Sequence, residues 1–85
     1  MTVSRKSRPV KLLRWRTHRG ARVFTAVYQT QKYDYLLVVR FSDETWDYKA
    51  YDLDSDKVCY EGWACETAAA AMKQLELEVE ERDEE

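Results

Sequence analysis

The sequence contains only two glycines, one proline, one histidine and two cysteines among its 85 residues. With Gly20 and Gly62 alone, it cannot form the glycine-rich loops that hold the phosphates of nucleotides. A single histidine excludes a metal site built from several histidines, and the spacing of His18, Cys59 and Cys65 matches no compact zinc motif. We therefore expect no metal, no cofactor and no enzymatic activity.

Long apolar stretches are also missing. The longest apolar run covers residues 35–39, whereas a membrane span needs roughly 20 residues. The basic N-terminal residues are not followed by an apolar segment, so a secretory signal is not expected. Two cysteines are few for a disulfide-stabilised protein, and we expect two reduced thiols, with a Cys59–Cys65 disulfide as the alternative. These features predict a soluble, cytoplasmic protein that does not bind membranes.

Acidic residues are absent from the first 33 positions, which carry nine Lys or Arg. The remaining positions, 34–85, carry all 16 acidic residues and only five basic ones. The net charge of −2 thus hides a basic first part and an acidic remainder. Such asymmetry points to a partner of opposite charge, or to attraction between the two parts within one domain.

Alternation of apolar and polar side chains is the main pattern of the first two thirds of the chain, and it is typical of half-buried strands. We expect a flexible basic arm (1–9), one α+β domain (10–81) and an acidic tail (82–85), since 85 residues form a single domain. The domain should contain an antiparallel sheet of about four to five strands with one C-terminal helix packed on one face. The strands are expected at residues 13–18, 22–30, 35–42, 45–53 and 58–63.

The helix is expected to begin at Glu66 or Thr67 and to continue through four consecutive alanines, which have the highest helix propensity. The segment LELEVE (75–80) alternates as a strand would, which is the alternative at that point. In the helical interpretation Leu77 points away from the core. The residues expected to face the sheet are spaced by three and four positions: Ala68, Ala71, Met72, Leu75 and Val79.

The basic segment is our leading candidate for a binding site, because each Lys or Arg can neutralise a phosphate and release counterions. Arg14 and Arg16 alternate with Trp15, which should therefore face the core. A basic edge strand can also serve only to prevent aggregation. Our hypothesis is a non-enzymatic small protein that binds nucleic acid or a nucleoprotein complex. The candidate contact residues are Arg5, Lys6, Arg8, Lys11, Arg14, Arg16, Arg19 and Arg22.

The acidic helix offers an alternative, because regularly spaced carboxylates can imitate a phosphate backbone and fill a basic groove on a partner protein. Acids near a helix C-terminus oppose the helix dipole, although they also keep a protein soluble. A rather apolar outward face of the sheet could contribute to the same contact, or to a homodimer. The candidate residues are Glu76, Glu78, Glu80 and Glu81 on the helix and Leu36, Val38 and Tyr51 on the sheet.

The small size, the strand-rich body, the acidic end and the junction YEGWACETAAAAM (60–72) carry one broad resemblance. In these features the sequence is similar to small phage-encoded accessory proteins, a group that includes anti-CRISPR and other anti-defence inhibitors. The resemblance implies an inhibitor that acts by binding, and it implies no site residues.

Overall fold

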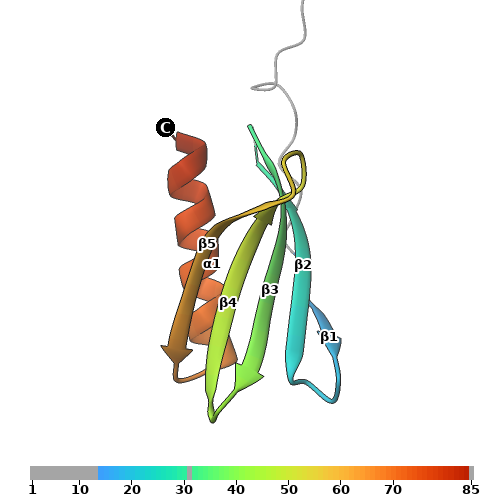
Figure 1. The fold of residues 1–85 in the computed structure, drawn as a ribbon, viewed down its shortest axis with the longest axis vertical. Coiled ribbons are helices and arrows are strands. Elements are labelled where there is room, and N and C mark those ends of the chain that lie inside the picture. Colours follow the sequence, from blue (N-terminus) through green and yellow to red (C-terminus); the bar gives the residue numbers. More distant parts are fainter. Residues whose placement is uncertain (1–13, 31, 85) are drawn as a thin grey trace, which may run out of the picture.

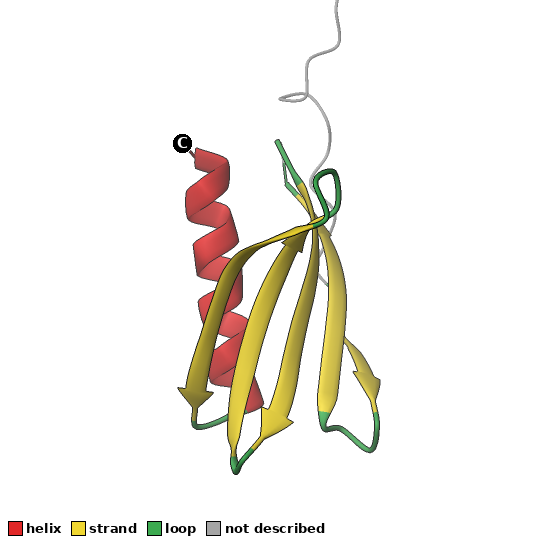
Figure 2. Ribbon diagram, viewed as in Figure 1, coloured by secondary structure: helices red, strands yellow, loops and turns green. Residues whose placement is uncertain are grey.

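The computed structural model describes residues 14–30 and 32–84. They form one five-stranded antiparallel sheet in the order β1-β2-β3-β4-β5, followed by one helix that lies along a single face (Figures 1 and 2). This arrangement confirms the expected α+β fold. The elements are β1 (Arg16–His18), β2 (Val23–Gln29), β3 (Asp34–Ser42), β4 (Thr45–Asp52), β5 (Lys57–Cys65) and α1 (Ala68–Glu84).

The sheet is a meander, in which every strand pairs with the next one along the chain. Ser42 pairs with Thr45, so β3 and β4 are joined by a loop of two residues, Asp43 and Glu44. Both have positive φ angles, 51° and 68°, as a type I′ hairpin turn requires. This turn matches the right-handed twist of the strands that it connects.

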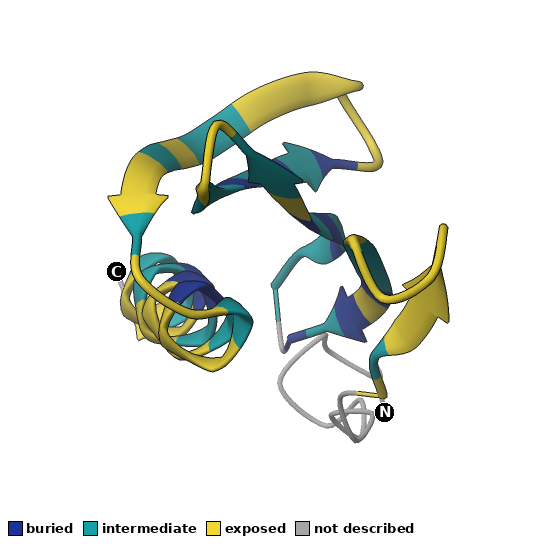
Figure 3. Cartoon of the chain, turned by 90° about the horizontal axis from the view of Figure 1, so that it is seen from below, coloured by how far each residue is buried: buried dark blue, intermediate teal, exposed yellow. Residues whose placement is uncertain are grey.

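The core lies between α1 and the sheet, on the concave side of the curved sheet (Figure 3); α1 contacts β3, β4 and β5, and β2 adds two buried residues. Its residues alternate along the strands and recur every three or four positions along the helix, as the sequence predicts. Leu77 is exposed, also as predicted. Burying each large apolar side chain contributes about 1.5–3 kcal/mol. The buried hydrophobic residues are Ala26, Tyr28, Tyr35, Leu37, Val39, Tyr48, Ala50, Ala71, Leu75 and Val79.

The first strand differs from its predicted range. Within the described residues it covers only Arg16–His18, and all three of its residues are exposed. Arg14 and Trp15 precede the strand, and position 13 lies outside the described residues. Trp15 is half-buried against the core, in agreement with the expectation that it faces inward. The short β1 is an edge strand with one neighbour.

The helix begins at Ala68, one or two residues after the predicted start at Glu66 or Thr67. The hydroxyl oxygen of Thr67 accepts a hydrogen bond from the amide of Ala70 over 3.0 Å, which caps the first turn. The helix continues to Glu84, so residues 82–84, expected in an acidic tail, are helical. The strand alternative for LELEVE is wrong.

Strand β5 contains irregularities that simple alternation does not predict. Its register against β4 shifts twice, between Trp46 and Tyr48 and between Ala50 and Tyr51. Ala64 has a φ angle of 60° near the first shift. Such bulges insert an extra residue into one strand and increase the local twist. As a result, the side chains of β5 do not follow a single period of two.

Candidate nucleic-acid interface

The face of the sheet opposite α1, which we call the open face, is organised in rows by the strand register. Directly paired residues point to the same face, so each chain of pairs across the sheet forms one row. The first row is apolar and crosses four strands: Val27, Leu36, Tyr51 and Val58.

Two further rows run beside it and carry the charges. Because opposite charges face each other in two cross-strand pairs, Arg40 with Asp47 and Lys49 with Glu61, these pairs also favour the observed register. The second row is Arg16, Thr25, Val38, Lys49 and Glu61, and the third is His18, Val23, Arg40 and Asp47.

A groove of about 420 Å³ lies at the β1 end of the open face. Arg14, Arg16 and His18 line it at β1 and just before it, and Val27 and Leu36 line it on β2 and β3. The groove therefore brings Arg14 and Arg16 of the predicted basic segment together with Leu36, one of the three residues predicted on the sheet face. Thr25 and Ala26 complete the lining.

A smaller hollow of about 80 Å³ lies on β3 and β4. Arg40 and Lys49 contribute positive charges to its lining, while Val38 and Tyr51 contribute apolar surface. Val38 and Tyr51 are two of the residues that the sequence predicts on the outward face. Asp47 and Tyr48 also contact this hollow.

The remaining predicted basic residues are divided between different places. Arg19 lies in the exposed turn between β1 and β2. The guanidinium of Arg22 lies 5.7 Å from the ring centre of Phe41, which is two residues from buried Val39 and so shares the helix side of the sheet. Arg22 therefore does not join the groove. Arg5, Lys6, Arg8 and Lys11 lie outside the described residues.

Trp63 is a prominent feature of the open face that the sequence analysis did not single out. It is 67% exposed. It shares its face with Glu61 two residues before it, whereas Gly62 between them faces the ring of Tyr48 on the helix side. The polar Glu61 was the signal in the sequence, since a strand residue two positions from a solvated carboxylate is on the solvated face.

Some of the acidic side chains of α1 accept hydrogen bonds from residues of the sheet. The Tyr48 hydroxyl donates a hydrogen bond to Glu78 over 3.1 Å, and the Tyr28 hydroxyl donates a longer one, 3.4 Å, to Glu80. Burial, together with the Glu78 carboxylate, raises the pKa of Tyr48 to about 12. Two of the four predicted helix carboxylates are thus engaged within the chain.

The other two predicted carboxylates of α1 differ in exposure. Glu81 is exposed, whereas Glu76 is half-buried. Burial, and next the nearby Glu80 carboxylate, raises the pKa of Glu76. The predicted row of acids is therefore not a uniform charged surface.

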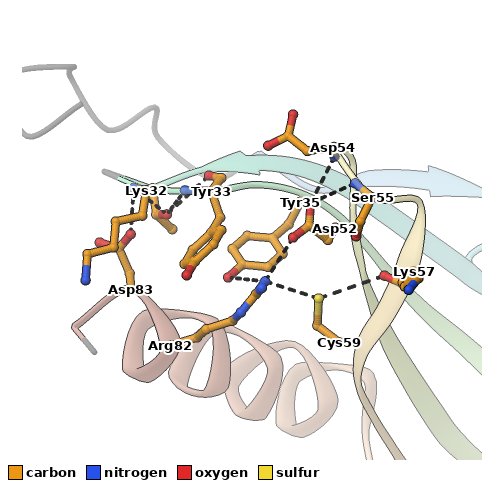
Figure 4. A network of polar contacts seen from close by, with 11 residues as sticks. Lys32, Tyr33, Tyr35, Asp52, Asp54, Ser55, Lys57, Cys59, Arg82 and Asp83 are labelled. Carbon is orange, nitrogen blue, oxygen red and sulfur yellow. Dashed lines mark hydrogen bonds and ion pairs between the residues drawn. The ribbon is translucent and has the colours of Figure 1, made fainter. Parts of the chain in front are cut away.

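Arg82 is the centre of a polar network that fastens the end of α1 to the sheet (Figure 4). Its Nη1 atom lies 3.2 Å from the Asp52 carboxylate, 3.2 Å from the Tyr35 hydroxyl and 3.2 Å from the Cys59 sulfur. The guanidinium also stacks on the Tyr33 ring, 3.9 Å from its centre. The network gives a structural role to the Arg82 guanidinium and the Cys59 thiol, to which the sequence assigned none.

Asp52 is buried at the end of β4 and accepts further hydrogen bonds from the amides of Asp54 and Ser55, over 2.9 and 3.3 Å. Burial alone would raise the pKa of Asp52, but these amides and Arg82 together hold it below its usual value. The carboxylate is therefore charged and satisfied at neutral pH. A second contact ties α1 to the β2–β3 connection, where the Lys32 amide donates to Asp83 over 2.8 Å.

Comparisons with protein-family models, with curated proteins and with solved structures find no match for this chain. No helix within residues 14–30 and 32–84 combines the length and the apolar character needed to cross a membrane. Over the same residues, no three side chains of His, Cys, Asp or Glu are grouped so that they could hold a metal ion.

Proposed function

We propose that this protein is a non-enzymatic binding protein that engages nucleic acid, alone or within a nucleoprotein complex, through the basic segment and the open face. The observation that carries the proposal is the groove, whose lining combines Arg14, Arg16 and His18 with the apolar side chains of Val27 and Leu36. Guanidinium groups bind phosphate oxygens with two parallel hydrogen bonds. The apolar wall can contact sugars and bases at the same time.

The distribution of charge over the two sides of the sheet supports the same orientation. Strand β1 and its turn present Arg16 and Arg19 at exposed positions, while exposed Glu80, Glu81 and Glu84 lie on the helix side. A polyanion is attracted to the first region and repelled by the second. The chain would therefore approach nucleic acid with β1 and the open face first.

The test is a titration of labelled DNA and RNA oligonucleotides at several salt concentrations, followed by fluorescence anisotropy. Each lost phosphate contact lowers the slope of log K against log salt by about 0.7 for single strands and about 0.9 for duplex DNA. We expect the double variant Arg14→Gln/Arg16→Gln to bind more weakly and to lose about 1.4 to 1.8 from the slope.

The matched control is Lys73→Gln, which removes a positive charge from an exposed position of α1. It should leave both the affinity and the slope unchanged. If the control and the groove variant weaken binding equally, or if the unmodified protein binds no nucleic acid at low salt, the proposal fails.

A partner protein with a basic groove is the second candidate, as for an inhibitor that acts by binding. The exposed carboxylates of Glu80 and Glu81 favour it. Its weakness is that Glu78 and Glu80 already accept hydrogen bonds from the sheet, because a docking partner would compete with those contacts.

A further inference from the structure

We infer that the nucleic acid bound by the open face is single-stranded, and that Trp63 stacks on one of its unpaired bases. This inference rests on the proposed function and adds the class of ligand to it. It is carried by the shape of the open face, the exposure of Trp63 and the arrangement of charges between β1 and β5.

The width of the open face argues against base contacts with a duplex. Neighbouring strands lie about 4.8 Å apart, so the open face is about 19 Å wide from β1 to β5. The major groove of B-DNA is about 12 Å wide and admits a helix or a two-stranded ribbon. A five-stranded face can rest on the backbone of a duplex, but its central side chains cannot reach paired bases.

Trp63 is well placed for an unpaired base. Its indole is largely exposed to water. Trp63 belongs to β5, and its side chain lies on the face that α1 does not cover. Every base has a flat aromatic surface, so stacking on tryptophan is favourable whatever the sequence. The exposed apolar residues Val27 and Val58 lie on the same face and form the two ends of the apolar row.

The charges on the open face divide it into two parts. Arg14 and Arg16 line the groove at the β1 end. Asp47 and Glu61 lie at the other end of the face: Glu61 is two residues before Trp63 in β5, and Asp47 is on the neighbouring strand β4. Carboxylates repel phosphates, but they accept hydrogen bonds from the amino groups of bases. This polarity favours a strand that binds the groove at β1 through its phosphates and then crosses the open face, so that a later nucleotide brings its base to Trp63 on β5.

A second copy of this chain is the main competing occupant of an apolar sheet face. The arginines of the groove favour a polyanion over another copy, because the open-face carboxylates that a second copy could offer, Asp47 and Glu61, already face Arg40 and Lys49 across the strands. The two occupants can be distinguished by experiment. Removal of the Trp63 ring should weaken single-strand binding if the occupant is nucleic acid, and should break a dimer if the occupant is a second copy.

The experiment compares single-stranded and duplex oligonucleotides of the same mixed sequence, about 16 nucleotides long, within the range of single-strand site sizes. We expect the single strand to bind more tightly at equal salt. Trp63→Ala should weaken single-strand binding about 5- to 150-fold, the range that one lost base stack produces, and should leave duplex binding unchanged. Trp63→Phe keeps an aromatic ring and should lose less.

The control variant is Leu77→Ala, which truncates an exposed apolar residue on α1 and should have no effect on binding. Circular dichroism and thermal unfolding of each variant establish that the fold is kept. Quenching of tryptophan fluorescence by the single strand should be smaller in Trp63→Phe than in the unmodified protein.

The outcomes separate this inference from the proposed function. Equal affinity for both oligonucleotides, with no effect of Trp63→Ala, would overturn the inference and leave the proposed function standing. No binding of either oligonucleotide would overturn both. A dimer in light scattering that Trp63→Ala converts to a monomer, with single-strand affinity unchanged, would assign the open face to a second copy and overturn the inference.

Discussion

Replacement of Arg82 by methionine should remove much of the stability of this domain. Methionine keeps the unbranched, flexible stem of arginine but cannot bond to Asp52, Tyr35 or Cys59. Asp52 would remain charged at a site where its side chain is only 8% exposed, while Arg82 itself is 26% exposed. The variant therefore tests a single partly buried ion pair together with its stacking contact.

The magnitude follows from the contacts. Loss of one partner of a buried ion pair costs about 3–5 kcal/mol, and a cation–π contact at a partly exposed site contributes about 0.5–1 kcal/mol. Because Asp52 keeps its hydrogen bonds from Asp54 and Ser55 and water reaches Arg82, we expect the lower end, about 3 kcal/mol. Small domains without disulfides have a total stability of only about 3–5 kcal/mol.

The assay is urea unfolding followed by circular dichroism, with thermal unfolding as a second measurement. A loss of about 3 kcal/mol corresponds to a fall in Tm of about 12 to 24 °C for a domain of this size. Arg82→Lys keeps the charge but loses the planar group that stacks on Tyr33, so it should recover only part of the loss. Lys73→Met removes an exposed cation from the same helix and should change stability by less than about 0.5 kcal/mol.

The pH dependence gives an independent check. Since the folded-state pKa of Asp52 is lowered, its contribution is present above the unfolded pKa of about 3.9 and is lost as the pH falls through the folded value. In Arg82→Met this acid sensitivity should decrease. A free energy of unfolding within about 0.5 kcal/mol of the unmodified protein would refute the reasoning, because it would mean that water replaces Arg82 at no cost.

Three other changes test the turn, the bulged strand and the buried tyrosines. Glu44→Gly should stabilise the protein by about 0.5–1 kcal/mol in urea unfolding, because glycine adopts the positive φ of this turn without strain; destabilisation would contradict this. Gly62→Ala should cost about 1–3 kcal/mol in the same assay, since a Cβ atom would collide with the buried ring of Tyr48; an unchanged midpoint would count against the packing. Burial raises the pKa of Tyr35 and Tyr48 to about 12, above the unfolded value of about 10. Their contribution to stability is therefore complete below about pH 10 and lost as the pH rises through about 12, and a flat alkaline stability profile would exclude it.

Much of the fold could be predicted because its determinants are local. Alternation in residues 35–42 and 45–53 identified two strands and their buried faces, and the spacing of Ala71, Leu75 and Val79 identified the helix stripe. These patterns depend only on the periods of strands and helices. The sequence therefore predicted the fold class and the helix side of the core.

The features that escaped prediction depend on contacts between distant segments. Arg82 lies in an acidic stretch of the sequence, and nothing near it shows that Asp52 and Tyr35 lie within reach in the fold. Glu78 was assigned to a free surface for the same reason, since its partner Tyr48 is 30 residues away. The exposure of Trp63 was overlooked although the local alternation with Glu61 and Gly62 indicates it, because tryptophan is a large apolar residue that is usually buried on average.

The meander also has a consequence for the order of folding. Each strand of the sheet pairs with its neighbour in sequence, so these contacts close short loops at a small entropic cost. The contacts of α1 with the far end of the sheet join residues up to 52 positions apart, as between Tyr28 and Glu80. Long closures of this kind are expected to form after the sheet, beyond the transition state.

Contacts that form late resist unfolding and do not speed folding. The Arg82 network should therefore slow unfolding. Its loss would increase the unfolding rate, while the refolding rate would change little. Before α1 docks, the sheet would expose Tyr35, Leu37 and Val39 to other molecules. The interval before the helix docks is then the stage at which this small domain is most open to aggregation.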